Sequence, residues 1–185
     1  MKRPLARIPR LKLDFVRLAG PWRMRKKLIA ALEPILPTLV AHSGKLPPGT
    51  YFVTIALTDD RQQKELNHQF RGINKATNVL AFPQFTPRVL TRLKPGKEPV
   101  FLGDVSLAYQ YVVGESKKDH KILCNHIIHL VIHGILHILG YDHQSSRQAA
   151  AMESLERIIL DAMHIPDPYT SSPPTPRRAP RSNLL

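Results

Sequence analysis

Three of the nine histidines, His133, His137 and His143, have a spacing that suits a single metal ion. On an α-helix, residues four positions apart lie on one face about one turn apart, so His133 and His137 can share an ion. Gly140 can take the positive φ that ends a helix, which lets the chain fold back and bring His143 to the same point. Three neutral imidazoles favour zinc and leave a fourth position for water, as in catalytic rather than structural zinc sites.

The same spacing occurs in the metzincin proteases, which carry a glutamate general base directly after the first histidine. Gly134 stands at that position, so the pattern supports a metal site but not a proteolytic mechanism. The spacing alone still permits a metal hydrolase of another substrate class, or histidines that share a helix face without binding metal. Asp142, next to the third histidine, is a candidate for orienting it or accepting a proton, and a turn-forming aspartate is an equally good interpretation.

Two further histidines and the single cysteine lie on the same segment. At 100° per residue, His126 and His129 share a helical face with His133 and His137. His129, one turn before His133, is placed to hydrogen-bond near the site, whereas His126 is further away and is interpreted as a bystander. Cys124 is interpreted as a small buried packing residue. A single cysteine excludes an intramolecular disulfide and fits a reducing cytosol.

The elements that position these histidines are predicted from hydrophobic periodicity and from glycine, proline and capping residues. Strands are predicted over residues 12–18, 51–57, 77–82 and 101–108. Helices are predicted over residues 22–42, 60–70, 108–117, 121–139 and 145–163. A proline-containing basic loop is predicted over residues 84–99. The histidine motif therefore falls on one helix and on the turn that follows it.

The composition indicates one folded domain with a tail at each end. Of the 185 residues, 43% are hydrophobic, which is enough to bury a core without disulfides. Residues 1–10 are predicted to be a flexible basic N-terminus, and residues 11–165 the folded domain. Six of the residues 166–180 are proline, which predicts a disordered Pro/Arg-rich tail over residues 166–185.

The charge points to a polyanionic partner, either nucleic acid or an anionic membrane surface, because 27 Lys+Arg against 14 Asp+Glu give +13. Residues 1–27 hold ten cations and one acid, residues 84–99 and 166–185 carry +3 and +2, and the rest of the chain carries −1. No apolar run reaches the length of about 18 residues that crosses a bilayer, and the N-terminus lacks the apolar segment of a secretory signal. These features predict a cytoplasmic protein without a membrane partner.

The residues from His133 to His143, His-Gly-Ile-Leu-His-Ile-Leu-Gly-Tyr-Asp-His, resemble the signature of the YbeY family of endoribonucleases, the rRNA maturation factors. Residues 70–83, Phe-Arg-Gly-Ile-Asn-Lys-Ala-Thr-Asn-Val-Leu-Ala-Phe-Pro, are similar to that family's Tyr-Arg-Gly-x-Asp-Lys-x-Thr-[Asp/Asn]-Val-Leu-Ser-Phe block. The sequence departs from the block at Asn74 and Ala81, where the family usually has Asp and Ser. Neither difference changes one of the three histidines.

Two weaker matches extend this resemblance. The family's Gly-Asp strand is matched by residues 102–104, Leu-Gly-Asp, and its final helix by residues 152–156, Met-Glu-Ser-Leu-Glu. The order and approximate spacing of all four segments agree with the family, and the resemblance covers residues 11–163.

The resemblance implies a compact single α+β domain, with a small mixed sheet of about four strands, several helices and a zinc ion on His133, His137 and His143. It implies a single-strand-specific ribonuclease that acts in 16S rRNA 3′-end maturation and ribosome quality control. The implied partners are rRNA and the small ribosomal subunit, with ribosomal or assembly proteins as further candidates. By motif position Arg71 would be the family's functional arginine, and the candidate catalytic residues are Arg71, His133 and Asp142.

The residues of the second block can also be interpreted by their own chemistry. A guanidinium can hold phosphate oxygens bidentately, although Arg71 taken alone, at a predicted helix end, would be an ordinary surface arginine. Lys75 is a further candidate phosphate contact, and Asp104 is a candidate for orienting a ligand or stabilising the fold. Because no general base is evident, the alternative function is a non-catalytic, zinc-stabilised assembly factor that binds rRNA.

Overall fold

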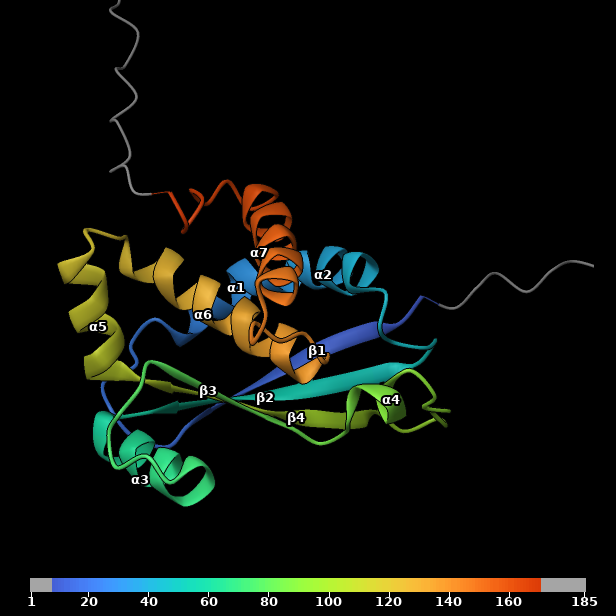
Figure 1. Ribbon diagram of the computed structural model, residues 1–185, viewed down its shortest axis with the longest axis horizontal. Coiled ribbons are helices and arrows are strands. Elements are labelled where there is room, and N and C mark those ends of the chain that lie inside the picture. Colours follow the sequence, from blue (N-terminus) through green and yellow to red (C-terminus); the bar gives the residue numbers. More distant parts are fainter. Residues whose placement is uncertain (1–7, 171–185) are drawn as a thin grey trace, which may run out of the picture.

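The chain folds around one four-stranded mixed β-sheet that has helices on both faces (Figure 1). The computed structural model describes residues 8–170. The strands are β1 (Arg10–Arg17), β2 (Thr50–Thr58), β3 (Val79–Pro83) and β4 (Val100–Ala108). The helices are α1 (Arg25–Leu32), the 3-10 turn η1 (Glu33–Ile35), α2 (Leu36–Ser43), α3 (Asp60–Arg71), α4 (Pro87–Leu90), α5 (Tyr109–Lys118), α6 (Leu123–Ile138) and α7 (Ser146–Asp161).

The sheet has the strand order β1-β2-β4-β3, in which β1, β2 and β4 are parallel and β3 runs antiparallel to β4. In β2, every second residue from Tyr51 to Leu57 is fully buried and the residues between them are only half-buried. That two-residue period is the pattern of a strand with one face on a core. The sheet and the helices around it confirm the α+β class and the mixed four-stranded sheet that the family resemblance implies.

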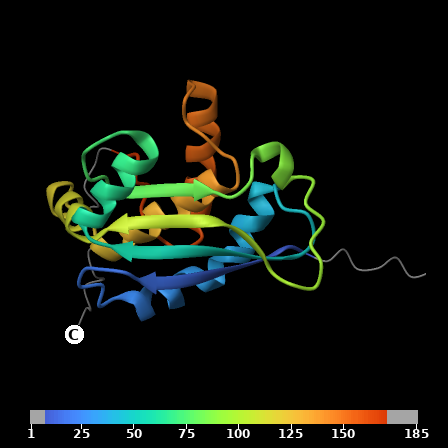
Figure 2. The ribbon, with the colours of Figure 1, turned by 90° about the horizontal axis from the view of Figure 1, so that it is seen from below.

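Helix α6 lies across one face of the sheet, and α3 lies on the opposite face (Figures 1 and 2). Eleven of the sixteen residues of α6 are buried, because it packs on β3 and β4 and is also contacted by α1, α5 and α7. Gly134 allows the closest approach, since a Cβ there would lie 2.6 Å from Cγ1 of Val105 in β4. Within residues 8–170 no single helix is long and apolar enough to span a membrane; only α5 and α6 together meet that test, with a 119° bend between them.

The predicted helix over residues 22–42 is divided into α1, η1 and α2. Pro34 and Pro37 stand in the first turns of η1 and α2, and a proline inside a helix removes a hydrogen bond and clashes with the preceding turn. The first helix also starts later than predicted, because Trp22 is buried and its Nε1 donates to the Thr58 carbonyl oxygen at 2.7 Å. The predicted loop over residues 84–99 contains the short helix α4.

The predicted tails fall mostly on residues 1–7 and 171–185, which lie outside the described residues. The described part of the C-terminal segment contacts α7. Arg157 donates from Nε to Asp167 at 3.0 Å, and the Tyr169 hydroxyl donates to the carboxylate of Glu156. The residues directly after the predicted domain boundary therefore take part in the fold of its last helix.

Candidate metal centre

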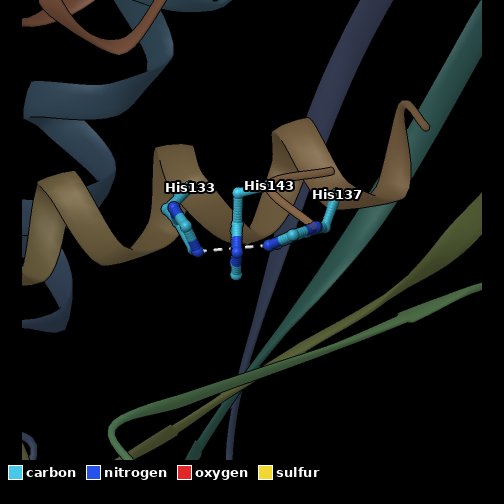
Figure 3. A group of neighbouring side chains, drawn as sticks. All are labelled: His133, His137 and His143. Carbon is cyan, nitrogen blue, oxygen red and sulfur yellow. Dashed lines mark hydrogen bonds between the residues drawn. The ribbon is translucent and has the colours of Figure 1, made fainter. Parts of the chain in front are cut away.

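His133, His137 and His143 meet at one point, as their spacing predicts (Figure 3). His133 and His137 project from consecutive turns of α6, and His143 reaches the same point from the loop that follows. One nitrogen from each ring lies within 4.8 Å of the others, and the Nε2 atoms of His133 and His137 are 3.2 Å apart. Two nitrogens bound tetrahedrally to zinc at about 2.05 Å lie roughly 3.3 Å apart, so the residues fit a zinc ion.

The turn after α6 brings the third histidine into place. Gly140 has a φ of 84°, the left-handed conformation that the sequence predicts for it. Tyr141 then donates its backbone N–H to the Leu136 carbonyl oxygen at 3.0 Å, which ends the helix. His143 is exposed, whereas His133 and His137 are half-buried. The site is therefore held by the fold on one side and open to solvent on the other.

The two helical histidines have hydrogen-bond partners on the ring nitrogen that faces away from the site. Nδ1 of His133 donates to Oε1 of Glu156 at 2.8 Å, and Nδ1 of His137 donates to the Tyr141 carbonyl oxygen at 3.0 Å. These acceptors place the proton on Nδ1 and leave the Nε2 lone pair for a metal ion. Burial lowers the pKa of His137, and the neighbouring His133 and His143 lower it further, so this imidazole stays neutral as a ligand must be.

Glu156 in α7 lies behind His133, on the side away from the point where the three histidines meet, and its side chain is fully buried. It accepts hydrogen bonds from His133, from Nε2 of His129 at 2.9 Å, and from the hydroxyl of Tyr169. Burial raises the pKa of Glu156, but these three hydrogen bonds outweigh it and lower the pKa to about 2. A permanent carboxylate therefore lies behind His133. His129 thus forms a hydrogen bond near the site, as predicted, and its partner is Glu156.

Sequence reasoning missed Glu156 and Tyr169 as site residues. Glu156 entered only through a family helix motif, and Tyr169 lies in the segment predicted to be a disordered tail. The glutamate is 23 positions from His133 and 27 from His129, so no local spacing indicates the contact. The usable signal is weaker: a glutamate on the apolar face of an amphipathic helix needs a buried partner.

A second polar cluster lies along α6 and does not reach the metal centre. Nε2 of His126 hydrogen-bonds a Glu115 carboxylate oxygen at 3.0 Å, and Asn78 donates to the same carboxylate, also at 3.0 Å. Burial is the main cause that lowers the pKa of His126. His126 therefore lies apart from the three ligands. Cys124 is buried, as predicted.

Asp142 makes the hydrogen bond of a turn. Its Oδ1 accepts the backbone N–H of His143 at 2.8 Å, and within residues 8–170 its carboxylate has no hydrogen bond to an imidazole. The other carboxylate at the site, Glu156, is already occupied by three donors. Gly134 leaves no space for the glutamate of the metzincin pattern, because Val105 lies directly against it.

The structure does not bring Arg71 into contact with the histidines. Arg71 is the exposed last residue of α3, and α3 lies on the face of the sheet opposite α6 (Figure 1). Lys75 is also exposed, and its carbonyl oxygen accepts from Asn67 at 2.7 Å. Asp104 is half-buried in β4, opposite Phe82 of β3. The second sequence block thus runs from the end of α3 to β3, and within it β3 packs against the histidine helix α6.

The chain was compared with known families and structures. Residues 24–164 match the family model described as endoribonuclease YbeY. The protein named endoribonuclease YbeY from Bartonella henselae is 38% identical over 160 residues, covering 86% of this chain and 97% of its own length. The protein of that name from Nitrobacter hamburgensis is 45% identical over 152 residues, covering 82% and 78%.

A solved structure shares the fold. The solution structure of a Thermotoga maritima protein superposes with a TM-score of 0.53 at 21% sequence identity, covering 86% of this chain and 99% of the other. The family match spans α1 to α7 and includes all three histidines. The chain therefore belongs to the endoribonuclease YbeY family, whose members are hydrolases of RNA phosphodiester bonds.

Proposed function

We propose that this chain is a zinc-dependent endoribonuclease that cleaves single-stranded RNA in the cytoplasm, in 16S rRNA 3′-end maturation and ribosome quality control. The observation that supports it most is the group of three histidines, in which both helical members direct Nε2 towards one point. The exposed side of the group leaves room for a water molecule and an RNA strand. The small ribosomal subunit is the proposed partner, together with ribosomal or assembly proteins.

The chain's own residues prepare the site for the ion and its substrate. A zinc ion bound here would polarise a phosphate oxygen and lower the pKa of a coordinated water towards about 7. Glu156 fixes the ring orientation of His133, and the Tyr141 carbonyl fixes that of His137. The negative charge of Glu156 also makes the His133 imidazole a stronger donor to a cation. The ligands are thus oriented before the metal and the RNA bind.

Arg71 is proposed to bind a phosphate of the substrate. It is exposed and forms no ion pair with any other residue among 8–170, so its guanidinium is available to an anion. Because α3 and α6 lie on opposite faces of the sheet, we expect Arg71 to position the strand rather than to contact the scissile phosphate. Arg71→Ala should then raise KM and leave kcat largely unchanged. A loss confined to kcat would instead assign it to the reacting phosphate.

The central test is cleavage by untagged protein of matched single-stranded and duplex rRNA fragments, with metal analysis of the same samples. We expect zinc in the purified protein, cleavage of the single strand only, loss with a chelator and recovery with added zinc. His137→Ala should abolish both zinc binding and cleavage. Cleavage that persists unchanged in His137→Ala would indicate a contaminating nuclease, and equal cleavage of the duplex would refute single-strand specificity.

One observation favours the alternative, a non-catalytic assembly factor in which zinc stabilises the fold. Among the described residues, the carboxylate that contacts the histidines, Glu156, is saturated with donors and cannot serve as a free general base. If wild-type protein and His137→Ala both bind rRNA and neither cuts it, the alternative is correct. If only the wild-type protein cuts while both bind, the endoribonuclease is correct.

A further inference from the structure

The surface along β1 and the start of α1 has an unbalanced charge. Between residues 8 and 32 the chain has seven cations and a single acid, Asp14. All seven cations are exposed, and none forms an ion pair with another residue among 8–170. We call this set the basic track; it consists of Arg10, Lys12, Arg17, Arg23, Arg25, Lys26 and Lys27.

The basic track follows one edge of the molecule. β1 (dark blue) and β3 (green) are the two edge strands of the sheet, with β2 and β4 between them (Figure 2). Arg10 and Lys12 lie at the start of β1 and Arg17 at its end, and an eight-residue strand is about 26 Å long. The other four cations follow in the loop and in the first turn of α1. Arg10 and Lys12 share one face of β1 and Arg17 has the opposite one, so the charge is spread over the length of the strand and the start of α1, which suits a chain of phosphates better than a single anion.

The track also contains a concave part. Arg23 lines a hollow of about 480 Å³ together with Pro21, Met24 and Tyr109. A cation on the wall of a hollow raises the local potential more than one on a flat surface, because the low-dielectric walls focus the field. The phosphate backbone of a nucleic acid would be held most strongly at this end of the track.

The placement of three of these cations opposes the stability of the fold. Arg25, Lys26 and Lys27 occupy the first turn of α1, where the positive end of the helix dipole disfavours cations. That turn has no acidic residue, and the N-cap residue Met24 makes no side-chain hydrogen bond. Adjacent like charges also repel each other. The stability of α1 therefore does not account for these three cations.

We propose that the basic track binds the phosphate backbone of RNA outside the segment held at the metal centre. The inference rests on the proposed function for its choice of RNA as the polyanion. α6, which carries two of the three ligands, packs on β3 and β4, and three strand spacings of about 4.8 Å separate β1 from β3 by roughly 14 Å. A dinucleotide bound at the metal centre is too short to cross that distance to the β1 part of the track, whereas a longer RNA can contact both.

The chain offers a matched pair of variants to test this. Lys26→Gln/Lys27→Gln removes two adjacent lysines from the first turn of α1, and Lys117→Gln/Lys118→Gln removes two from the last turn of α5. Binding of a twenty-nucleotide single-stranded RNA to the full chain is measured with a chelator present, from 50 to 300 mM salt. Each lost phosphate contact lowers the slope of log K against log salt by about 0.7. We expect a decrease of about 1.4 for the α1 variant and no change for the α5 variant.

Stability and cleavage separate this role from a structural one. The α1 variant should keep or raise the Tm, because it removes cations from the positive end of a helix dipole, and the α5 variant should lower it slightly. Cleavage of a dinucleotide should be the same in both variants, and KM for the long RNA should rise roughly tenfold in the α1 variant alone. If the proposed function is wrong, the wild-type protein will not cleave RNA, but the difference in RNA binding between the two variants can still be measured.

Three outcomes would overturn the proposal. The first is an equal salt slope for the two variants. The second is a lowered Tm in the α1 variant that accounts for its weaker binding. The third is unchanged RNA binding combined with weaker binding to vesicles rich in phosphatidylserine, which would assign the track to a membrane surface. Adding Arg23→Gln and Arg25→Gln to the α1 variant should lower the slope further, by about 1.4 again.

Discussion

Of the three α6 histidines that pair with a carboxylate, His133 and His126 have different glutamate partners and use different ring nitrogens. His133 bonds Glu156 through Nδ1 and directs Nε2 at the open site. His126 bonds Glu115 through Nε2, and its Nδ1 is buried without a hydrogen-bond partner among the described residues. A histidine beside a glutamate is therefore not enough to make a metal ligand. The pair must also leave the second nitrogen facing the ion.

The two glutamates differ in a related way. Glu156 is fully buried and accepts from three different side chains, whereas Glu115 remains 30% exposed and accepts from His126 and Asn78. The carboxylate of Glu156 thus fixes the position of His133, while Glu115 joins α5 to α6 and to the residue before β3. The comparison assigns metal positioning to the first pair and stability to the second, and the following variants test that assignment in order of expected effect.

The largest effect is expected for the ligand itself. His133→Ala removes one of three ligands, and we expect the bound metal to fall to background together with the loss of RNA cleavage. Metal analysis of dialysed protein measures it. His126→Gln is the control and should retain one ion per chain. Metal loss in His126→Gln would show that the second pair also serves the site.

Glu156→Gln comes next. An amide in place of the carboxylate keeps the size but cannot accept from every donor around it, so metal affinity should fall about 10- to 100-fold. The buried donors left without an acceptor should also cost about 1–3 kcal/mol of unfolding free energy. Competition with a zinc chelator and urea unfolding measure the two quantities. Glu115→Gln should lower stability only, so an equal loss of metal affinity in both variants would contradict the comparison.

The position of α6 over the sheet is tested by Gly134→Ala. A Cβ at 2.6 Å from Val105 forces the helix away from β4, and we expect a loss of roughly 1–3 kcal/mol in urea unfolding. Gly114→Ala in α5 meets no atom within 4 Å and should instead stabilise the protein by roughly 0.5–1 kcal/mol. An unchanged free energy of unfolding for Gly134→Ala would show that α6 can shift away from β4 without loss of stability.

The smallest effect is a pH dependence from His126. Burial lowers the pKa of His126 below its ordinary value of 6.5, against the opposing effect of Glu115, and Lys121 and His129 lower it further. The unfolded chain then binds more protons than the folded one below pH 6.5, so stability falls as the pH decreases through that range, by at most about 1.4 kcal/mol per pH unit. Urea unfolding from pH 7.5 to 5.5 should show a shallower decrease for His126→Gln than for the wild type. Parallel curves would remove His126 as the cause.

The local elements were predictable because their signals lie within a few residues. The helix over residues 121–139 is confirmed as α6, with Gly140 ending it. The division of the helix over residues 22–42 was missed, although Pro34 and Pro37 carry the signal for it. The start of α1 at Arg25 could not be predicted from neighbouring residues, because Trp22 is held by a hydrogen bond to Thr58, 36 positions away.

The sequence by itself identified the three histidines that meet at one point, because i and i+4 spacing and a glycine turn are properties of a single segment. Only the tertiary structure decided which nitrogen of His133 and of His137 faces that point, since this depends on acceptors such as Glu156 from a distant helix. It also decided that α3, which ends at Arg71, lies across the sheet from α6, and that β1, which carries three of the basic residues, is an edge strand. Spacing along a chain predicts which side chains share a face, but hydrogen bonding and charge act between whatever groups the fold brings together.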